Sequence, residues 1–305
     1  MRNDTVPGVT DRRDCPRRQA GTGHRPDRRV VLGTLFTLVT ATGAAEKVRV
    51  LSATQIPESA NGEHRSKVML GDSLVRLVRV GMLAPEKLRA IYAGRGGIPQ
   101  ELDDALLRPS QEPIVLTRDN ANTYVTLLWP IGLGNRMRAN VDSPLNGRMR
   151  FRFASTGGWT LGTAPNGGFD FNRHRIVDLS RAQGARVARV ARETFRPCCD
   201  NSTFFQDCNH GSALLGLLAL GAAQGLTEEE LFRETLAFNM HWFPEQYART
   251  AAFFKATTGL DWAQLDARVV MSAKFSSASG WRTNVAGQGE PRGLGAPPSG
   301  PGCAV

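Results

Sequence analysis

The chain has 305 residues, of which 41% are hydrophobic and 22% charged, close to an ordinary globular protein that can bury a sizeable core. Its formal net charge is +10, but residues 1–45 hold eight Arg and four Asp, so +4 of that charge lies there. The remaining charge is spread thinly, and no Lys/Arg stripe is interleaved with aromatic residues. Composition and charge therefore exclude a typical nucleic-acid-binding protein, and we expect no nucleic acid among the partners.

Residues 28–45 have the layout of a signal peptide. The pair Arg28-Arg29 precedes an uncharged run that ends in small residues and is too short to span a bilayer comfortably. The stretch "DRRVVLG" also resembles a twin-arginine signal. We therefore expect residues 1–45 to be a signal peptide with a long n-region, and the mature chain to start near Glu46 and keep no transmembrane anchor. An exported chain in the periplasm or outside the cell can form disulfides.

The mature chain is predicted to be mostly helical. Apolar residues recur at helical spacing over 67–82, and a short helix is expected over 85–94. A buried helix is predicted over 117–135 and an amphipathic one over 178–195, where Pro197 would end it. The run 211–225 is apolar on every face, which is typical of a buried helix. Capping-box spacing opens a helix at Thr227, another follows from Pro244 to Gly259, and a short one is expected near 261–269.

Two segments do not follow this pattern. Residues 140–176 are rich in Gly, Asn, Ser and Arg, and they predict a long irregular insert of the kind that is often functional. Residues 281–305 are rich in Gly and Pro, which predicts a disordered tail. The expected organisation is thus a signal segment (1–45), a single helical domain with a Gly-rich insert (46–280) and a tail (281–305).

Three cysteines and a histidine lie within thirteen residues of "RPCCDNSTFFQDCNHG", immediately before the apolar run: Cys198, Cys199, Cys208 and His210. Thiolates and imidazoles are ligands for zinc, copper and iron. The order C-C-x8-C-x-H is not that of a zinc finger. The leading hypothesis is a transition-metal site formed by Cys199, Cys208 and His210, with Cys198 as an extra ligand or a resolving thiol.

Two alternatives remain open for the same residues. In the first, the protein is a thiol-dependent enzyme. Cys208 would then be a nucleophile activated by the N-terminus of the following helix and assisted by His210. In the second, Cys208 pairs with Cys198 or Cys199 in a disulfide, which would stabilise a structural or interaction domain by roughly 2–3 kcal/mol.

In the metal-site hypothesis, Asp207 and Asn209 are candidates for orienting the imidazole of His210.

Several residues elsewhere are candidate helpers. Glu230, Glu234 and His241 fall on roughly one face of the helix opened by Thr227 and could add a ligand or a base, although a solvated polar face explains them as well. His174 is expected on the surface. In "STGGWTLG" (155–162), Gly157 and Gly158 could bring backbone close to a ligand, and Trp159 could form one wall of its pocket.

The cysteine segment also carries a resemblance. Together with "TEEELFRETLAFNMHWFPEQY", "PIVLTRDNANTYVTLLWPIGLGN" and "ASTGGWTLG", it resembles a group of uncharacterised bacterial exported proteins over most of residues 80–255. The resemblance implies a bacterial source and a location in the cell envelope. It implies no activity, because none is established for that group.

Overall fold

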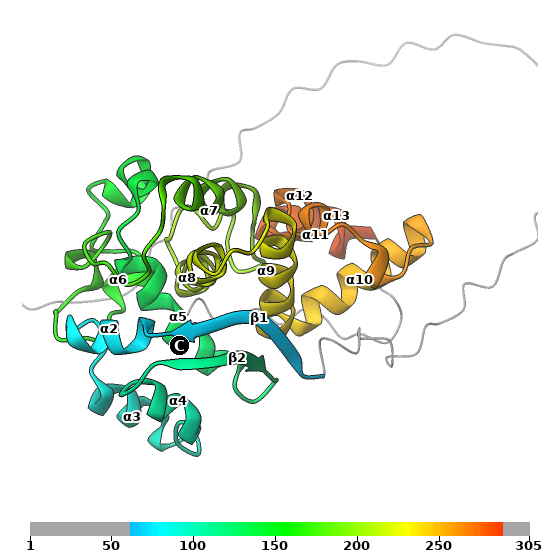
Figure 1. Cartoon of the computed structure of the whole chain (residues 1–305). Helices are drawn as coiled ribbons and strands as arrows, with labels where there is room; N and C mark the ends of the chain where they lie inside the picture. The colour runs from blue at the N-terminus through cyan, green and yellow to red at the C-terminus, as the bar shows by residue number, and fades with distance from the viewer. Residues whose placement is uncertain (1–61, 289–305) are drawn as a thin grey trace, which may run out of the picture. The chain divides into compact units, whose positions relative to one another are not determined.

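The computed structural model describes residues 62–288, and the sequence predictions for residues 1–45 lie outside this range. Twelve α-helices and one two-stranded sheet form the described part, which confirms a mostly helical fold (Figure 1). The strands are β1 (His64–Gly71) and β2 (Ser110–Leu116). The longer helices are α5 (Ala121–Gly134), α7 (Arg181–Glu193), α8 (Asn209–Ala223), α9 (Glu228–Trp242) and α10 (Pro244–Thr258). The shorter ones are α2 (Ser73–Arg79), α3 (Pro85–Ala93), α4 (Gln100–Ala105), α6 (Ala154–Gly157), α11 (Ala267–Val270), α12 (Ala273–Ser276) and α13 (Ala278–Asn284).

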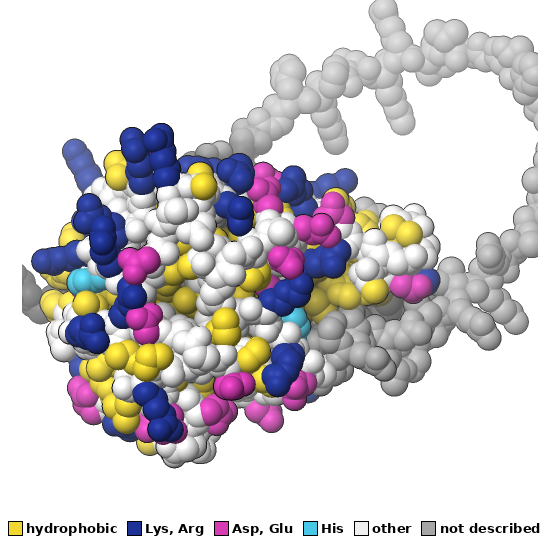
Figure 2. All heavy atoms as spheres, in the orientation of Figure 1, with side chains coloured by type: hydrophobic (Ala, Val, Ile, Leu, Met, Phe, Trp, Pro, Cys, Tyr) yellow, Lys and Arg dark blue, Asp and Glu magenta, His cyan; other side chains and the backbone are white. Residues whose placement is uncertain are grey.

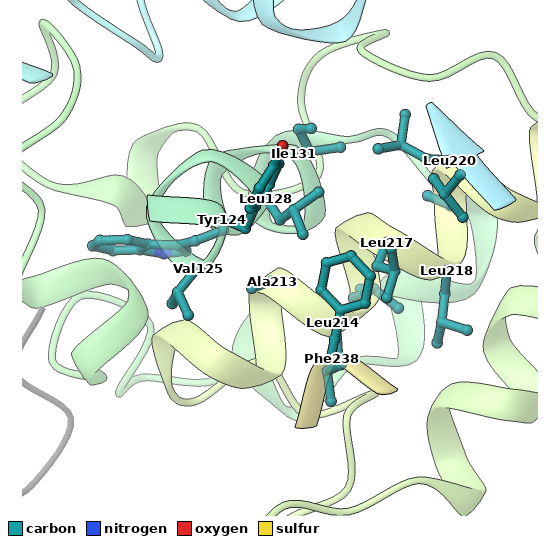
Figure 3. Packing of buried hydrophobic residues seen from close by; sticks show 14 of the residues in the cluster. Tyr124, Val125, Leu128, Ile131, Ala213, Leu214, Leu217, Leu218, Leu220 and Phe238 are labelled. Carbon is teal, nitrogen blue, oxygen red and sulfur yellow. The ribbon is translucent and has the colours of Figure 1, made fainter. Parts of the chain in front are cut away.

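Helices α5 and α8 form the centre of the core. Nearly every residue of both helices is buried, as the all-round apolar sequence of 211–225 predicts. Figure 3 shows Leu128 and Ile131 of α5 beside Leu214 and Leu217 of α8, with Phe238 of α9 closing the cluster. Pro130 lies inside α5 without ending it.

Glycines let the α5 and α8 backbones touch. A Cβ on Gly132 would lie 1.8 Å from the carbonyl oxygen of Ser212, and one on Gly216 would lie 2.4 Å from that of Leu128. Both distances are far below van der Waals contact, so the two helices can approach this closely only with glycine at both positions. The N-terminal end of α8, which carries the cysteine cluster, is thereby fixed against α5.

The helix predicted over 67–82 is wrong in its first part. Residues 64–71 form β1, which pairs antiparallel with β2 in a register that joins His64 to Leu116 and Gly71 to Ser110. Buried residues alternate along β1 at Ser66, Val68 and Leu70, which is the period of a strand. The chain turns at Gly71, whose φ of 58° favours glycine, and only then begins α2.

The other predicted helices are confirmed with small changes in their ends, except the one expected near 261–269, which is divided into a 3₁₀ turn (Trp262–Gln264) and the short α11. Capping boxes open α7 at Ser180 and α9 at Thr227, and Gly259 ends α10 in the left-handed conformation. The predicted Gly-rich insert (140–176) begins within one 3₁₀ turn, Arg138–Asp142, and contains two more, Pro144–Asn146 and Gly167–Phe169, as well as the single-turn α6.

The predicted start of the tail at residue 281 is too early. Helix α13 continues to Asn284, and a 3₁₀ turn follows over Ala286–Gln288. Trp281 and Val285 are buried, so apolar contacts outweigh the Gly-rich composition here. Residues 289–305 lie outside the described range.

Among the helices of residues 62–288, none combines the length and the apolar character needed to cross a bilayer.

Replacing Gly132 by Ala tests the contact between α5 and α8. We expect this substitution to lower the free energy of unfolding by about 1–3 kcal/mol or more, because the added methyl group must push the helices apart. Gly184→Ala in α7 is the matched control. A Cβ there meets nothing within 4 Å, so this variant should gain about 0.5–1 kcal/mol from helix propensity. Urea unfolding measures the free energy of unfolding of both variants. Equal changes in this free energy for the two substitutions would contradict the close contact between α5 and α8.

Candidate functional site

The cysteine cluster lies in a loop between α7 and α8 that is tied down along its length. The backbone amides of Thr203 and Phe204 donate to the carbonyl oxygens of Thr194 and Ala191 at 2.8 and 2.9 Å, which folds the loop back onto the end of α7. Phe204 is buried there. At the other side, the carbonyl oxygen of Cys199 accepts a hydrogen bond from Ala278 of α13 at 3.0 Å. The cluster is therefore held against both α7 and α13.

The three thiols lie close together. The sulfur of Cys198 is 3.7 Å from that of Cys208, well beyond the S–S bond length of about 2.05 Å. The sulfur of Cys199 is 3.9 Å from a carboxylate oxygen of Asp207. Two overlapping groups result, in each of which the possible ligand atoms lie within 4.8 Å of one another. One is Cys198, Cys208 and His210, and the other is Cys199, Asp207 and Cys208.

Cys208 is placed by the start of α8. It is the N-cap residue of that helix, and its sulfur accepts a hydrogen bond from the backbone amide of Gly211 at 3.3 Å. The Nε of Arg196 donates to the same sulfur at 3.1 Å. Two N–H groups and the positive end of the helix dipole therefore stabilise negative charge on Cys208, as the thiol-enzyme hypothesis expects.

Arg196 is a fully buried guanidinium beside the cluster, and it is the residue that sequence reasoning missed. One of its terminal nitrogens donates to Asp207 at 2.6 Å and the other to the carbonyl oxygen of Asn201 at 2.9 Å. Burial lowers the pKa of Arg196, but Cys208, the other two thiols and Asp207 raise it, and the net effect is a raised pKa. The only sequence signal was its position two residues before Cys198.

Burial limits how many of the acidic groups of the cluster can be ionised at the same time. Hydrogen bonding with Cys198 lowers the pKa of Cys199, but Cys208 and burial outweigh it and raise the pKa to about 12. Burial also raises the pKa of Asp207, against the opposing effect of Arg196. The site thus holds Cys199 protonated at neutral pH, and a further positive charge would be needed to ionise several of its thiols together.

His210 faces the cluster from the first turn of α8. Its Nδ1 is buried and has no hydrogen-bond partner within residues 62–288, and its ring packs against Trp242 and Phe243 at centroid distances of 5.6 and 4.8 Å. Burial lowers the pKa of His210, and the neighbouring Arg196 lowers it further, against an opposing effect of Cys208. The imidazole is therefore neutral at pH 7, the form that can bind a metal.

Gly211 makes room for Arg196. A Cβ at Gly211 would lie 2.4 Å from a terminal nitrogen of the guanidinium and 2.6 Å from its central carbon. The glycine that follows Asn209-His210 in the sequence is therefore needed for the Arg196–Cys208 contact. Composition alone gives no signal for this role.

The structure brings together all four predicted ligands but groups them differently. Cys198, predicted as an extra ligand or a resolving thiol, shares a group with Cys208 and His210. Cys199, predicted as a main ligand, shares one with Asp207 and Cys208. Asp207 does not hold the imidazole as expected, because its carboxylate binds Arg196 and Asn201. The disulfide hypothesis for Cys208 stays a prediction.

The candidate helpers on α9 lie in a different network. Glu234 accepts hydrogen bonds from Ser66 and from the backbone of Lys67, at 2.7 and 2.9 Å, and lies 3.0 Å from the Nε2 of His64. The ring nitrogens of His241 lie near the carbonyl oxygens of Ala237 and Gly62, at 2.8 and 3.1 Å. This network joins α9 to β1. Glu230 takes part in the capping box and an ion pair with Lys67.

The remaining candidates lie in the Gly-rich insert. Trp159 is buried and packs edge-on against Trp129 at 5.2 Å, and Gly157 and Gly158 lie at the end of α6. Trp159 thus contributes to the core. His174, expected on the surface, is partly buried and lies 2.9 Å from Asp170.

Comparisons with protein-family models, with curated proteins and with solved structures find no match for this chain.

The network around Glu234 predicts a pH dependence of stability. Burial raises the pKa of Glu234, but the hydrogen bonds with His64, Lys67 and Ser66 outweigh it and hold the pKa below its ordinary value of 4.5. A lowered pKa in the folded state contributes stability that is complete above about pH 4.5 and is lost as the pH falls through the folded value. Glu234→Gln should therefore be less stable than the wild type near pH 7, by about 1–3 kcal/mol, and the difference should shrink toward about pH 3.

Urea unfolding across this range measures the effect. Glu229→Gln is the control. Glu229 lies on the same helix, but it is exposed and forms an ion pair with Arg233. A difference between Glu234→Gln and the wild type that stays constant with pH would contradict the account.

Proposed function

We propose that the chain is an exported bacterial protein that holds a transition metal ion between Cys198, Cys208 and His210. Export rests on the signal-peptide layout of residues 28–45 and on the resemblance to bacterial exported proteins. Because export by the twin-arginine route delivers folded chains, it would allow a metal to be inserted before export. The metal-binding proposal rests on the geometry of the cluster.

The observation that carries the proposal is the grouping of two thiols with the imidazole of His210, whose Nδ1 is buried and has no hydrogen-bond partner within residues 62–288. A tetrahedral zinc ion with Zn–S bonds of about 2.3 Å places two sulfurs about 3.8 Å apart. The observed separation of the Cys198 and Cys208 sulfurs is 3.7 Å. An ion can therefore bind both sulfurs with little movement of the backbone.

The charges around the cluster favour a cation between the thiols. Ionising both Cys198 and Cys208 places two negative charges in a poorly solvated site, where Arg196 is already paired with Asp207. A divalent ion neutralises them. The Arg196 and Gly211 N–H groups would donate to the metal-bound sulfur of Cys208, an outer contact of the kind that tunes a metal site.

Three protein ligands leave one coordination position open. That arrangement is typical of zinc sites that act on a substrate, and of copper sites when the ligands are soft. Cys199 is the nearest additional ligand, since its sulfur lies within 4.8 Å of a ligand atom of both Asp207 and Cys208. The proposed role is metal binding with an exchangeable fourth position, and redox activity when the ion is copper or iron.

Metal content of the purified full-length protein tests the proposal. We expect close to one zinc, copper or iron ion per chain when the protein is purified without chelator, or after reduction and incubation with these ions. Cys208→Ser should remove it, and Cys198→Ser and His210→Ala should weaken binding at least tenfold, because each removes a ligand. Cys303→Ser is the matched control and should retain the metal.

Far-ultraviolet circular dichroism of each variant shows whether loss of metal reflects loss of fold. Folded protein that stays free of metal under all these conditions would refute the proposal. Equal retention of metal by Cys208→Ser and Cys303→Ser would also refute it.

A second candidate function, thiol catalysis by Cys208, is favoured by one specific observation. The sulfur of Cys208 accepts hydrogen bonds from Arg196 and Gly211, which stabilise a thiolate. Cys208 is nevertheless more buried than Cys198 and Cys199.

Alkylation of reduced, metal-free protein shows whether thiolate stabilisation or burial decides the reactivity of Cys208. The thiol-enzyme hypothesis predicts that iodoacetamide modifies Cys208 first, and that Arg196→Met slows this step because the thiolate loses its nearest cation. Peptide mass spectrometry identifies the modified residue. Faster modification of the more accessible Cys198 or Cys199 would exclude an activated Cys208.

A further inference from the structure

A cavity of about 640 Å³ lies outside the cysteine cluster, between the segment that follows α5 and the segment that leads into α7. Its volume is that of a small-molecule site. Three arginines line it: Arg136, Arg138 and Arg175. Figure 2 shows Lys and Arg side chains gathered at the left of the view, over the part of the molecule that carries α2 and α6.

The positive charge in this cavity is only partly offset by the protein. Within residues 62–288, the arginine side chains at 136, 138 and 175 form no ion pair. The carboxylate of the lining, Asp178, pairs with Arg76 at 2.8 Å and also interacts electrostatically with Arg175, so it offsets part of the charge. Like charges that share one cavity repel each other, so an anion bound there would relieve the repulsion. Guanidinium groups also match the geometry of oxyanions.

The uncharged residues of the lining indicate which chemical group the ligand carries beside its anion. Met137, Val141, Val177 and Leu179 contribute aliphatic surface, and no Trp, Tyr or Phe of the described part of the chain lines the cavity. A nucleobase would find no aromatic surface on which to stack. The lining therefore suits an aliphatic group attached to an anion, and three guanidinium groups suit a dianion better than a single carboxylate.

The two segments that form the cavity are held by the side chains of partly buried Asn172 and buried Asn135. Asn172 has a φ of 56°, and its Oδ1 accepts hydrogen bonds from the backbone of Met137 at 2.7 Å and from Asn140 at 3.3 Å. The Oδ1 of Asn135 accepts from the backbone amides of Ile176 and Val177 at 3.1 and 2.9 Å. The backbone of the lining is thus fixed before a ligand arrives, which lowers the entropy cost of binding.

From these features we infer that this cavity is a binding site for an aliphatic phosphate. The phosphate lies among Arg136, Arg138 and Arg175, and the aliphatic part lies on the apolar lining. A soluble phosphate ester and the headgroup of an anionic lipid share this chemistry. The site is independent of the metal proposed for the cysteine cluster.

Titration calorimetry of the full-length protein with inorganic phosphate and glycerol 3-phosphate tests the soluble source. Co-sedimentation with phosphatidylglycerol vesicles, compared with phosphatidylcholine vesicles, tests the lipid source. We expect saturable binding in at least one arm, and weaker binding at high salt because the contacts are ionic. Arg136→Gln and Arg138→Gln should each weaken it about tenfold, the effect of losing one hydrogen-bonded charge pair.

Arg118→Gln is the matched control, because Arg118 is exposed and does not line the cavity. Binding to a soluble phosphate assigns a metabolite-type ligand, and binding to phosphatidylglycerol alone assigns a lipid headgroup. Absence of saturable binding in every arm would overturn the inference. So would binding that Arg118→Gln weakens as much as Arg136→Gln and Arg138→Gln do.

Discussion

The site depends on one buried guanidinium, that of Arg196. It donates hydrogen bonds to the sulfur of Cys208, the carboxylate of Asp207 and the carbonyl oxygen of Asn201, and so joins three acceptors of the loop. A buried charge is tolerated only when it is paired and hydrogen-bonded, and removing one partner of such a pair typically costs about 3–5 kcal/mol. The loop between α7 and α8 is therefore held in one conformation by electrostatics as well as by packing.

The rigidity of the cluster also depends on the helices beneath it. Cys208 and His210 belong to the start of α8, and α8 is fixed against α5 where Gly132 and Gly216 let the backbones touch. Ser155 connects the two regions: its hydroxyl donates to the carbonyl oxygen of Gln206, and its own carbonyl oxygen accepts from the indole of Trp129 on α5. A ligand set positioned in this way loses little conformational entropy when an ion binds.

Sequence reasoning found the helices and the ligands because these depend on local patterns. Apolar periodicity marks α7 and α9, the all-round apolar run marks α8, and residue type marks the thiols and His210. It mistook β1 for a helix because Leu70 also fits helical spacing, whereas the pairing with β2 is a contact between segments distant in sequence. The end of the folded part was placed too early because the burial of Trp281 is likewise a tertiary property.

The parts of the site that could not be predicted are those set by three-dimensional proximity. Nothing in the spacing shows that Arg196 is buried, that Gly211 leaves room for it, or that Cys198 rather than Cys199 shares a group with His210. The arginine-lined cavity is formed by residues 136–141 and 172–180, which the sequence places in or beside an irregular insert without indicating that they meet.

X-ray absorption at the zinc edge of the zinc-loaded full-length protein tests the central claim most directly, because it reports the atoms bound to the ion. The account predicts two sulfurs at about 2.3 Å and one imidazole nitrogen at about 2.0 Å, with a light atom or the third sulfur in the remaining position. A first shell made only of nitrogen and oxygen would contradict it, because the ion would then lie away from Cys198 and Cys208.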